Sequence, residues 1–117
     1  MTEPLTIQVQ TETRGAVPGA EVRLAVQRLH SLLRVASEPV LYARIELAMS
    51  SDPAMPQPAS AAVTVDLNGR LIRAHATGVT MRAAVDLAGD RLRVRLERAA
   101  RNWAALRGTK AAGRGTA

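Results

Sequence analysis

With 117 residues, 47% of them apolar but only one Trp, one Tyr and no Phe, the chain is sized for a single domain with an aliphatic core. It has no cysteine for disulfides or thiolate metal sites, and no apolar run near the roughly 20 residues that a membrane-spanning helix requires. Its 16 basic residues outnumber 10 acidic ones, and all but one of them are Arg, whose planar guanidinium can bind phosphate with two parallel hydrogen bonds.

The first half of the chain predicts a strand, a helix and a second strand. Residues 5–9 alternate apolar with polar side chains, as a half-buried strand does, and the Gly- and Pro-containing stretch 11–19 is expected to be a loop. From 20 to about 36 the apolar residues recur every three or four positions, which indicates an amphipathic helix that Pro39 stops. Alternation returns over residues 40–49, the second strand.

The second half predicts a hairpin and a long helix. Residues 50–60 contain three prolines, which cannot donate to a sheet, so this stretch is expected to be a mobile loop. Strands over 61–67 and 70–77 flank Asn68-Gly69, the pair most typical of a two-residue hairpin turn. Thr80 is placed to cap a helix that runs over about 81–103.

Each element has a single apolar face. The inward strand residues are expected to be Leu41, Ala43, Ile45 and Leu47, then Ala61, Val63, Val65 and Leu67, then Ile72, Ala74 and Ala76. In the last helix the core stripe is Met81, Val85, Ala88, Leu92, Leu96, Ala99 and Trp103. The fold class is therefore α+β, in the order β-α-β-β-β-α, with both helices on one face of a four-stranded sheet whose first two strands are parallel. This domain covers 1–104, and the basic Gly/Ala/Arg residues 105–117 are expected to be a disordered tail.

The arginines of the last helix fall on two edges. At 100° per residue, one narrow sector without acids holds Arg91, Arg95 and Arg98, and another sector mixes Asp86, Asp90 and Glu97 with Arg82, Arg93 and Arg101. A codon bias toward Arg and Ala would scatter arginines among acids, as on the mixed edge. An edge without acids repels itself unless it faces phosphates, so it favours RNA binding, although an ordinary solvated face remains the alternative.

The first helix carries a second basic row opposite its apolar stripe, formed by Arg23, Gln27, His30 and Arg34, with Arg28 beside it. If the helices lie side by side, the two rows would border one shared outer surface suited to an RNA backbone. The residues expected to bind RNA are Arg91, Arg95, Arg98, Arg23, Arg28, Arg34 and His30.

The sequence predicts no enzyme. His30 lies among basic residues and His75 on the outward face of a strand, and neither has the partners of a metal cluster. The segment 15–19 lacks the Lys-Ser or Lys-Thr of a phosphate-binding loop, and no serine stands in a nucleophile elbow. We expect no cofactor, metal, small-molecule substrate or membrane partner. Because the N-terminus is unlike a secretory signal, we also expect a cytoplasmic location.

Residues 61–103 resemble a known family. The strand Ala-Val-Thr-Val-Asp-Leu, the turn Asn68-Gly69, the strand Arg-Leu-Ile-Arg-Ala and the helix opening 81–86 resemble the ribosome hibernation-promoting factors, also called ribosome-associated inhibitor A, protein Y or sigma-54 modulation proteins. The resemblance covers roughly residues 4–103. Long members carry a C-terminal dimerisation domain, where this chain has a Gly-Arg tail.

The resemblance implies a partner and a mode of action. Such proteins bind ribosomal RNA of the small subunit in the channel for messenger and transfer RNA, and thereby block translation in stress or stationary phase. It places basic contacts at Arg91 and Arg98, and less closely on the first helix. Two other functions stay open, a general double-stranded-RNA-binding module and a protein–protein regulator of transcription, and so does the oligomeric state.

Overall fold

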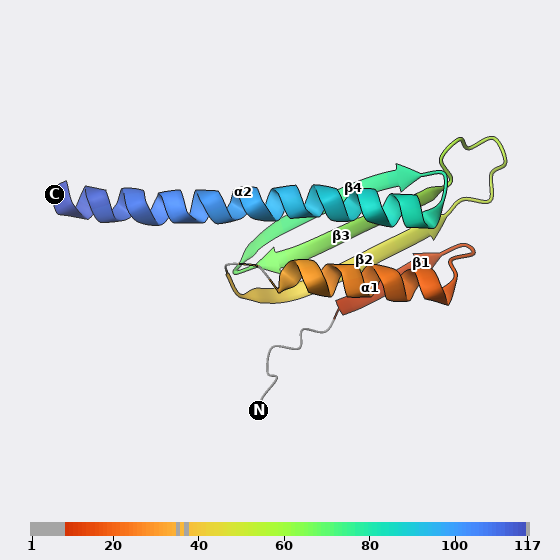
Figure 1. Ribbon diagram of the computed structural model, residues 1–117, viewed down its shortest axis with the longest axis horizontal. Helices are drawn as coiled ribbons and strands as arrows, with labels where there is room; N and C mark the ends of the chain where they lie inside the picture. Colours follow the sequence, from red (N-terminus) through yellow and green to blue (C-terminus); the bar gives the residue numbers. More distant parts are fainter. Residues whose placement is uncertain (1–8, 35, 37, 117) are drawn as a thin grey trace, which may run out of the picture.

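The computed structural model describes residues 9–34, 36 and 38–116, with the side chains of these residues as far as Asn102. The elements follow in the order β1 (Val9–Arg14), α1 (Gly19–Leu33), β2 (Val40–Met49), β3 (Ala59–Leu67), β4 (Arg70–Gly78) and α2 (Met81–Thr116). One sheet has the strand order β1-β2-β3-β4, with β1 parallel to β2 and the other neighbours antiparallel. Both helices lie side by side on one face of this sheet (Figure 1), so the predicted fold class is confirmed.

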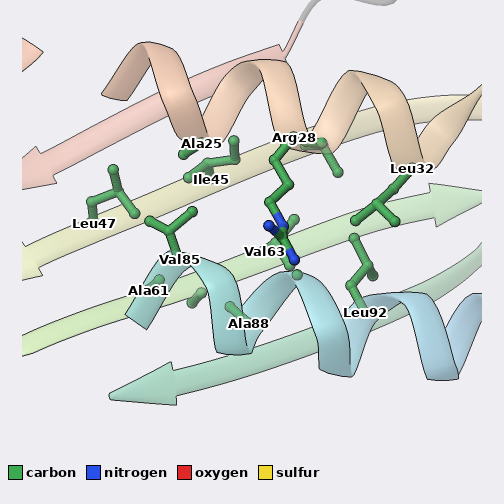
Figure 2. A pocket seen from close by; sticks show the side chains of 13 residues that line it. Ala25, Arg28, Leu32, Ile45, Leu47, Ala61, Val63, Val85, Ala88 and Leu92 are labelled. Carbon is green, nitrogen blue, oxygen red and sulfur yellow. The ribbon is translucent and has the colours of Figure 1, made fainter. Parts of the chain in front are cut away.

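The core is a layer of aliphatic side chains between the sheet and the helices. β3 runs through its middle and buries Ala61, Val63, Val65 and Leu67, as the alternation predicts. The strand also begins two residues earlier than predicted and buries Ala59, which was expected in the preceding loop. The α2 stripe is buried from Met81 to Ala99, together with Ala84, which the predicted stripe omits; the side chain of Trp103 lies outside the described residues. Between the helices, a small apolar pocket of about 30 Å³ remains over β2 and β3 (Figure 2).

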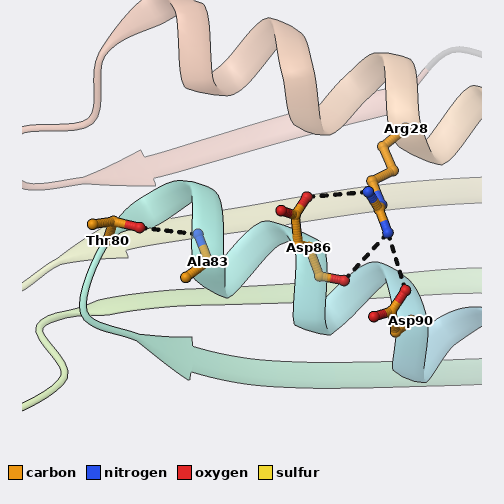
Figure 3. A network of polar contacts seen from close by, with 5 residues as sticks. All are labelled: Arg28, Thr80, Ala83, Asp86 and Asp90. Atoms are coloured by element: carbon orange, nitrogen blue, oxygen red, sulfur yellow. Dashed lines mark hydrogen bonds and ion pairs between the residues drawn. The ribbon is translucent and has the colours of Figure 1, made fainter.

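Local sequence signals fix the turn and the start of α2. Asn68 and Gly69 have φ angles of 55° and 95°, so the hairpin uses the left-handed backbone that its sequence predicts. The hydroxyl of Thr80 accepts a hydrogen bond of 3.1 Å from the amide of Ala83 and caps α2 (Figure 3), which confirms this prediction as well.

The N-terminal strand lies further along the chain than predicted. Residues 5–8 lie outside the described residues, and β1 occupies Val9–Arg14, where a loop was expected from residue 11 onward. Its backbone pairs with β2 from Val9–Ala43 to Arg14–Ala48. These polar residues form a strand because they pair with β2. An exposed edge strand needs no apolar alternation.

Leu41 faces solvent instead of the core, with an exposed fraction of 62%. The register of β2 against β3 shifts between Val40 and Tyr42, and the extra residue at this irregularity turns Leu41 off the inward face. Ala43, Ile45 and Leu47 beyond it are buried as predicted.

Both helices end elsewhere than the sequence pattern predicts. α1 stops at Leu33, three residues short of the expected end at 36. The pattern ends the last helix near 103 and predicts a disordered tail at 105–117, whereas the backbone of α2 is helical to Thr116 and extends past the sheet (Figure 1). The apolar stripe marks only the part of a helix that packs, and the Ala and Leu residues at 104–106 favour helix without it.

Candidate nucleic-acid interface

Arg91, Arg95 and Arg98 lie together along one flank of α2, as their spacing predicts, and we call this group the α2 basic edge. All three are exposed. With Asp90 and Val94 they line a shallow groove. Asp90 is the one carboxylate of that groove, and its Oδ1 atom is engaged by Arg28 of α1 at 3.1 Å.

Arg91 fixes the direction in which this edge faces. Its Nη1 donates a hydrogen bond of 2.7 Å to the backbone carbonyl of His75 in β4. β4 is an edge strand of the sheet, so this carbonyl accepts from a side chain rather than from a neighbouring strand. A guanidinium has five N–H donors, and an Arg91 anchored through one of them can still bind an anion. The α2 basic edge therefore lies beside β4, on the flank of α2 away from α1.

Arg95 and Arg98 form no ion pair with the carboxylates of the described residues, whose ion pairs involve Arg28, Arg44, Arg70 and Arg93. Like charges grouped in this way repel one another, and an external anion relieves the repulsion. The geometry therefore suits a polyanion.

Arg28 has a different environment from the one expected of an RNA-binding residue. Its Nη1 and Nη2 atoms each lie 3.1 Å from a carboxylate oxygen, of Asp86 and Asp90 respectively, and Nη2 also reaches the carbonyl of Asp86 at 3.4 Å (Figure 3). We call these three residues the helix seam. The Arg28 side chain also lines the apolar pocket of Figure 2. Its donors and its stem therefore join α1 to α2.

Gly89 makes room for this arginine. A Cβ atom on Gly89 would lie 2.5 Å from Nε and 3.3 Å from Cδ of Arg28, so a larger residue would push the arginine out of its place. The glycine inside α2, which costs about 1 kcal/mol of helix propensity against Ala, thus has a packing reason.

The two basic rows do not share one outer surface, contrary to expectation. Arg23, Gln27 and Arg34 are exposed and His30 is half-buried. Because Arg28 faces α2, the helical repeat turns the rest of the α1 row more than a quarter turn away from α2. The α2 basic edge faces β4, so the helix seam with its two carboxylates lies between the rows.

A second groove contains two basic residues that sequence analysis did not assign to RNA. It is lined by Ala62, Arg73, Ala74, His75, Arg91 and Arg95, and we call it the β4 groove. Alternation along β4 places Arg73 and His75 on the open face of the sheet, opposite Ala74 and Ala76. Only the tertiary structure brings the α2 basic edge beside them, so no local signal could have grouped these residues.

The far side of the open face is charge-balanced. Arg44 of β2 donates to Glu12 of β1, and its Nε lies 3.3 Å from Glu46. The hydrogen bond to Glu12 is the largest cause, before the contact with Tyr42, that raises the pKa of the Arg44 guanidinium above its ordinary value. The Arg44 guanidinium therefore stays charged beside these two carboxylates.

Other kinds of site find little support in the part of the chain that the structure describes. There, no three His, Cys, Asp or Glu side chains gather in a way that could hold a metal ion. Neither helix, within the same residues, combines the length and the hydropathy needed to cross a membrane.

Residues 20–103, which hold nearly all of α1, the strands β2 to β4 and α2 as far as residue 103, match the model of one family, described as sigma 54 modulation protein / S30EA ribosomal protein. The chain belongs to this family. The resemblance carried by residues 61–103 is thereby confirmed. A comparison with curated protein sequences gives no significant match.

Two solved structures share the fold. The N-terminal domain of Thermus thermophilus protein Y is 23% identical with a TM-score of 0.63, over 79% of this chain and 98% of that one. A ribosomal subunit interface protein from Coxiella burnetii is 22% identical with a TM-score of 0.64, over 77% of this chain and 93% of that one. At such identities the likeness shows the architecture, and the roles of individual residues must come from this chain's own geometry.

Proposed function

We propose that this protein silences translation by binding ribosomal RNA of the small subunit, in the channel for messenger and transfer RNA, through the α2 basic edge. The description of the family includes a ribosomal protein, which supports the ribosome as partner. The fold shared with a ribosomal subunit interface protein supports it as well. The observation that carries the proposal is the grouping of Arg91, Arg95 and Arg98 beside β4. A ribosomal partner also implies a cytoplasmic location.

The mechanism is occlusion without chemistry. Guanidinium groups hold phosphates with paired, charge-assisted hydrogen bonds, and phosphate contacts fix position without reading sequence. The sheet behind α2 keeps the edge rigid, and Arg91 is held by β4. A domain bound in this way excludes messenger and transfer RNA by its volume. With five to seven phosphate contacts, the log–log slope of affinity against salt is about −4 to −6.

The first helix has a supporting part in this proposal. Arg23, His30 and Arg34 form a second contact on a separate flank, so they would meet a different segment of RNA from the α2 basic edge. Arg28 contributes indirectly, since its donors point at Asp86 and Asp90 and hold the two helices together.

A charge reversal with a matched control tests the proposal. Replacing Arg91, Arg95 and Arg98 with Glu should abolish cosedimentation with purified small subunits while the circular dichroism spectrum stays unchanged. The control replaces Arg82, Arg93 and Arg101 with Glu, which makes the same change in net charge on the mixed edge of the same helix. It should keep most of the binding. Unchanged cosedimentation of the first variant, or an equal loss of cosedimentation in this variant and the control, would contradict the proposal.

Two alternatives predict different results. A general double-stranded-RNA-binding module, suggested by a sheet backed by two helices, would be stripped from ribosomes by excess duplex RNA, whereas a channel-specific protein would not. A protein–protein regulator, suggested by the words sigma 54 modulation in the family's description, would keep its partner after ribonuclease treatment.

A further inference from the structure

We propose that the RNA-binding surface continues from the α2 basic edge around the edge of the sheet, so that Arg73 and His75 bind further phosphates of the same RNA on the open face of β4. This inference rests on the proposed function and extends it to a part of the fold outside the helices. The ligand proposed for this surface is an RNA phosphodiester backbone.

The two grooves are continuous. The groove along α2 and the β4 groove share Arg91 and Arg95. Arg91 stands at the junction, because its guanidinium is hydrogen-bonded to the carbonyl of His75 at 2.7 Å. A polyanion bound to the arginines of α2 can therefore extend to the side chains of β4 within one continuous groove.

The floor of the β4 groove has a small residue beside the basic ones. His75 pairs with Ala62 across the β3–β4 ladder, and both residues line the groove. The methyl side chain of Ala62 is shorter than those of Arg73 and His75, which are both exposed. A backbone strand of a nucleic acid can lie against such a floor with the basic groups at its sides.

Charge separates this groove from the hollow next to it. Three arginines and a histidine line the β4 groove, and no carboxylate does. The neighbouring hollow on the open face shares Arg73 and His75 but also holds Glu12, Glu46 and Arg14. A polyanion is therefore attracted to β4, and this attraction ends at the charge-balanced hollow between β4 and β1.

The spacing of the basic groups also fits a backbone of repeating charges. Arg73 and His75 are two residues apart on a strand, a distance of about 6.6 Å along it. Arg91 and Arg95 are four residues apart on a helix, a rise of about 6 Å. A phosphate for each basic group requires a ligand with charges that repeat on this scale, as those of an RNA strand do.

The test is a binding series with purified small subunits over a range of KCl concentrations. The double variant Arg73→Gln/His75→Gln should bind at least about tenfold more weakly than the unaltered chain. Its log–log salt slope should be shallower by about 1.4–1.8, since two phosphate contacts are lost and each removes roughly 0.7–0.9. The matched control is Arg14→Gln, which removes a positive charge from the same open face but from the hollow that holds carboxylates. It should stay within twofold and keep the slope.

A second measurement locates the contact without ribosomes. The chain has two histidines, His30 on α1 and His75 in the β4 groove, so their ring signals in a nuclear magnetic resonance spectrum report separately on the two surfaces. On titration with an RNA duplex of about 16 base pairs, His75 should shift, and in the Arg73→Gln variant it should shift only at higher RNA concentration.

The outcomes separate this inference from the proposed function. If the double variant and Arg14→Gln both bind like the unaltered chain while the Arg91, Arg95 and Arg98 reversal loses binding, the inference is wrong and the proposed function stands. If small subunits are not bound but RNA duplex shifts His75, the proposed function fails and the groove is upheld. An unshifted His75, or a larger shift with polyglutamate than with RNA, would overturn the inference.

Discussion

The helix seam and the α2 basic edge occupy two flanks of the same helix and use arginine in opposite ways. At the seam, Arg28 meets two carboxylates at 3.1 Å each. At the edge, Arg91 meets a backbone carbonyl, and Arg95 and Arg98 lie beside other arginines. The role of a surface arginine therefore depends on what the fold places opposite it, because the arginine side chain and its formal charge are the same in both regions.

The helix seam contributes free energy on folding, whereas the α2 basic edge contributes free energy on binding. The seam side chains are 37–55% exposed, so each ion pair contributes at most about 1 kcal/mol, and this gain belongs to the folded protein alone. Repulsion along the α2 basic edge costs little at physiological salt, where the screening length is about 8 Å. That small cost is recovered when an anion binds. The seam thus serves folding and the edge serves binding.

The largest effect on stability is expected for Arg28→Glu. The change removes two ion pairs and places a third carboxylate beside Asp86 and Asp90, so the free energy of unfolding should fall by about 2 kcal/mol, or roughly 10 °C in Tm. Arg98→Glu, the same reversal on the other flank, should change it by less than about 0.5 kcal/mol. Urea unfolding of both variants decides the point. Equal stability losses would show that the seam has no special part in folding.

Binding to small subunits should depend on the α2 basic edge and not on the helix seam. Arg98→Gln should weaken binding to small subunits about tenfold, or roughly 1.4 kcal/mol, and make the salt slope shallower by about 0.9, because one phosphate contact is lost. Arg28→Gln should bind within about twofold of the unaltered chain once measured well below its Tm. A larger loss for Arg28→Gln than for Arg98→Gln would place Arg28 in the RNA contact instead of the seam.

A double-mutant cycle between Gly89 and Arg28 tests whether the glycine and the arginine are energetically coupled. Alone, Gly89→Ala gains about 1 kcal/mol of helix propensity but displaces Arg28 from its ion pairs, so its net effect on stability should be near zero. With Arg28→Ala already present, nothing is displaced and the same change should stabilise by about 1 kcal/mol. Urea unfolding of the four proteins gives a coupling energy near 1 kcal/mol. Additive effects would contradict the packing reason for this glycine.

The fold was largely predictable because its main signals are local. Strict alternation marks β3, a period of three to four marks both helices, and Asn68-Gly69 marks the hairpin. Leu41 could not be placed because an irregularity in pairing turned its side chain, and pairing is not written in one strand alone. The same holds for β1, whose polar residues become strand only beside β2.

The candidate site was predictable in part for the same reason. The α2 basic edge follows from spacing within one helix, so its three arginines were found together. Assigning Arg28 required knowing that Asp86 and Asp90, 58 and 62 residues away in sequence, lie opposite it. The β4 groove likewise joins Arg73 and His75 to a helix that the sequence does not place beside them.

The smallest expected effect concerns the division of the chain at 104. A protein ending there lacks residues 105–117, and its free energy of unfolding should stay within about 0.5 kcal/mol, because no sheet lies beneath the last part of α2 in Figure 1 to pack against it. Binding to small subunits should weaken only a few-fold at low salt, since the removed segment carries basic residues but not the α2 basic edge. Urea unfolding and the salt series measure both quantities. A loss of stability above about 1 kcal/mol would mean that the domain extends past 104, and a complete loss of binding would move the main RNA contact from the flank beside β4 to the end of the helix.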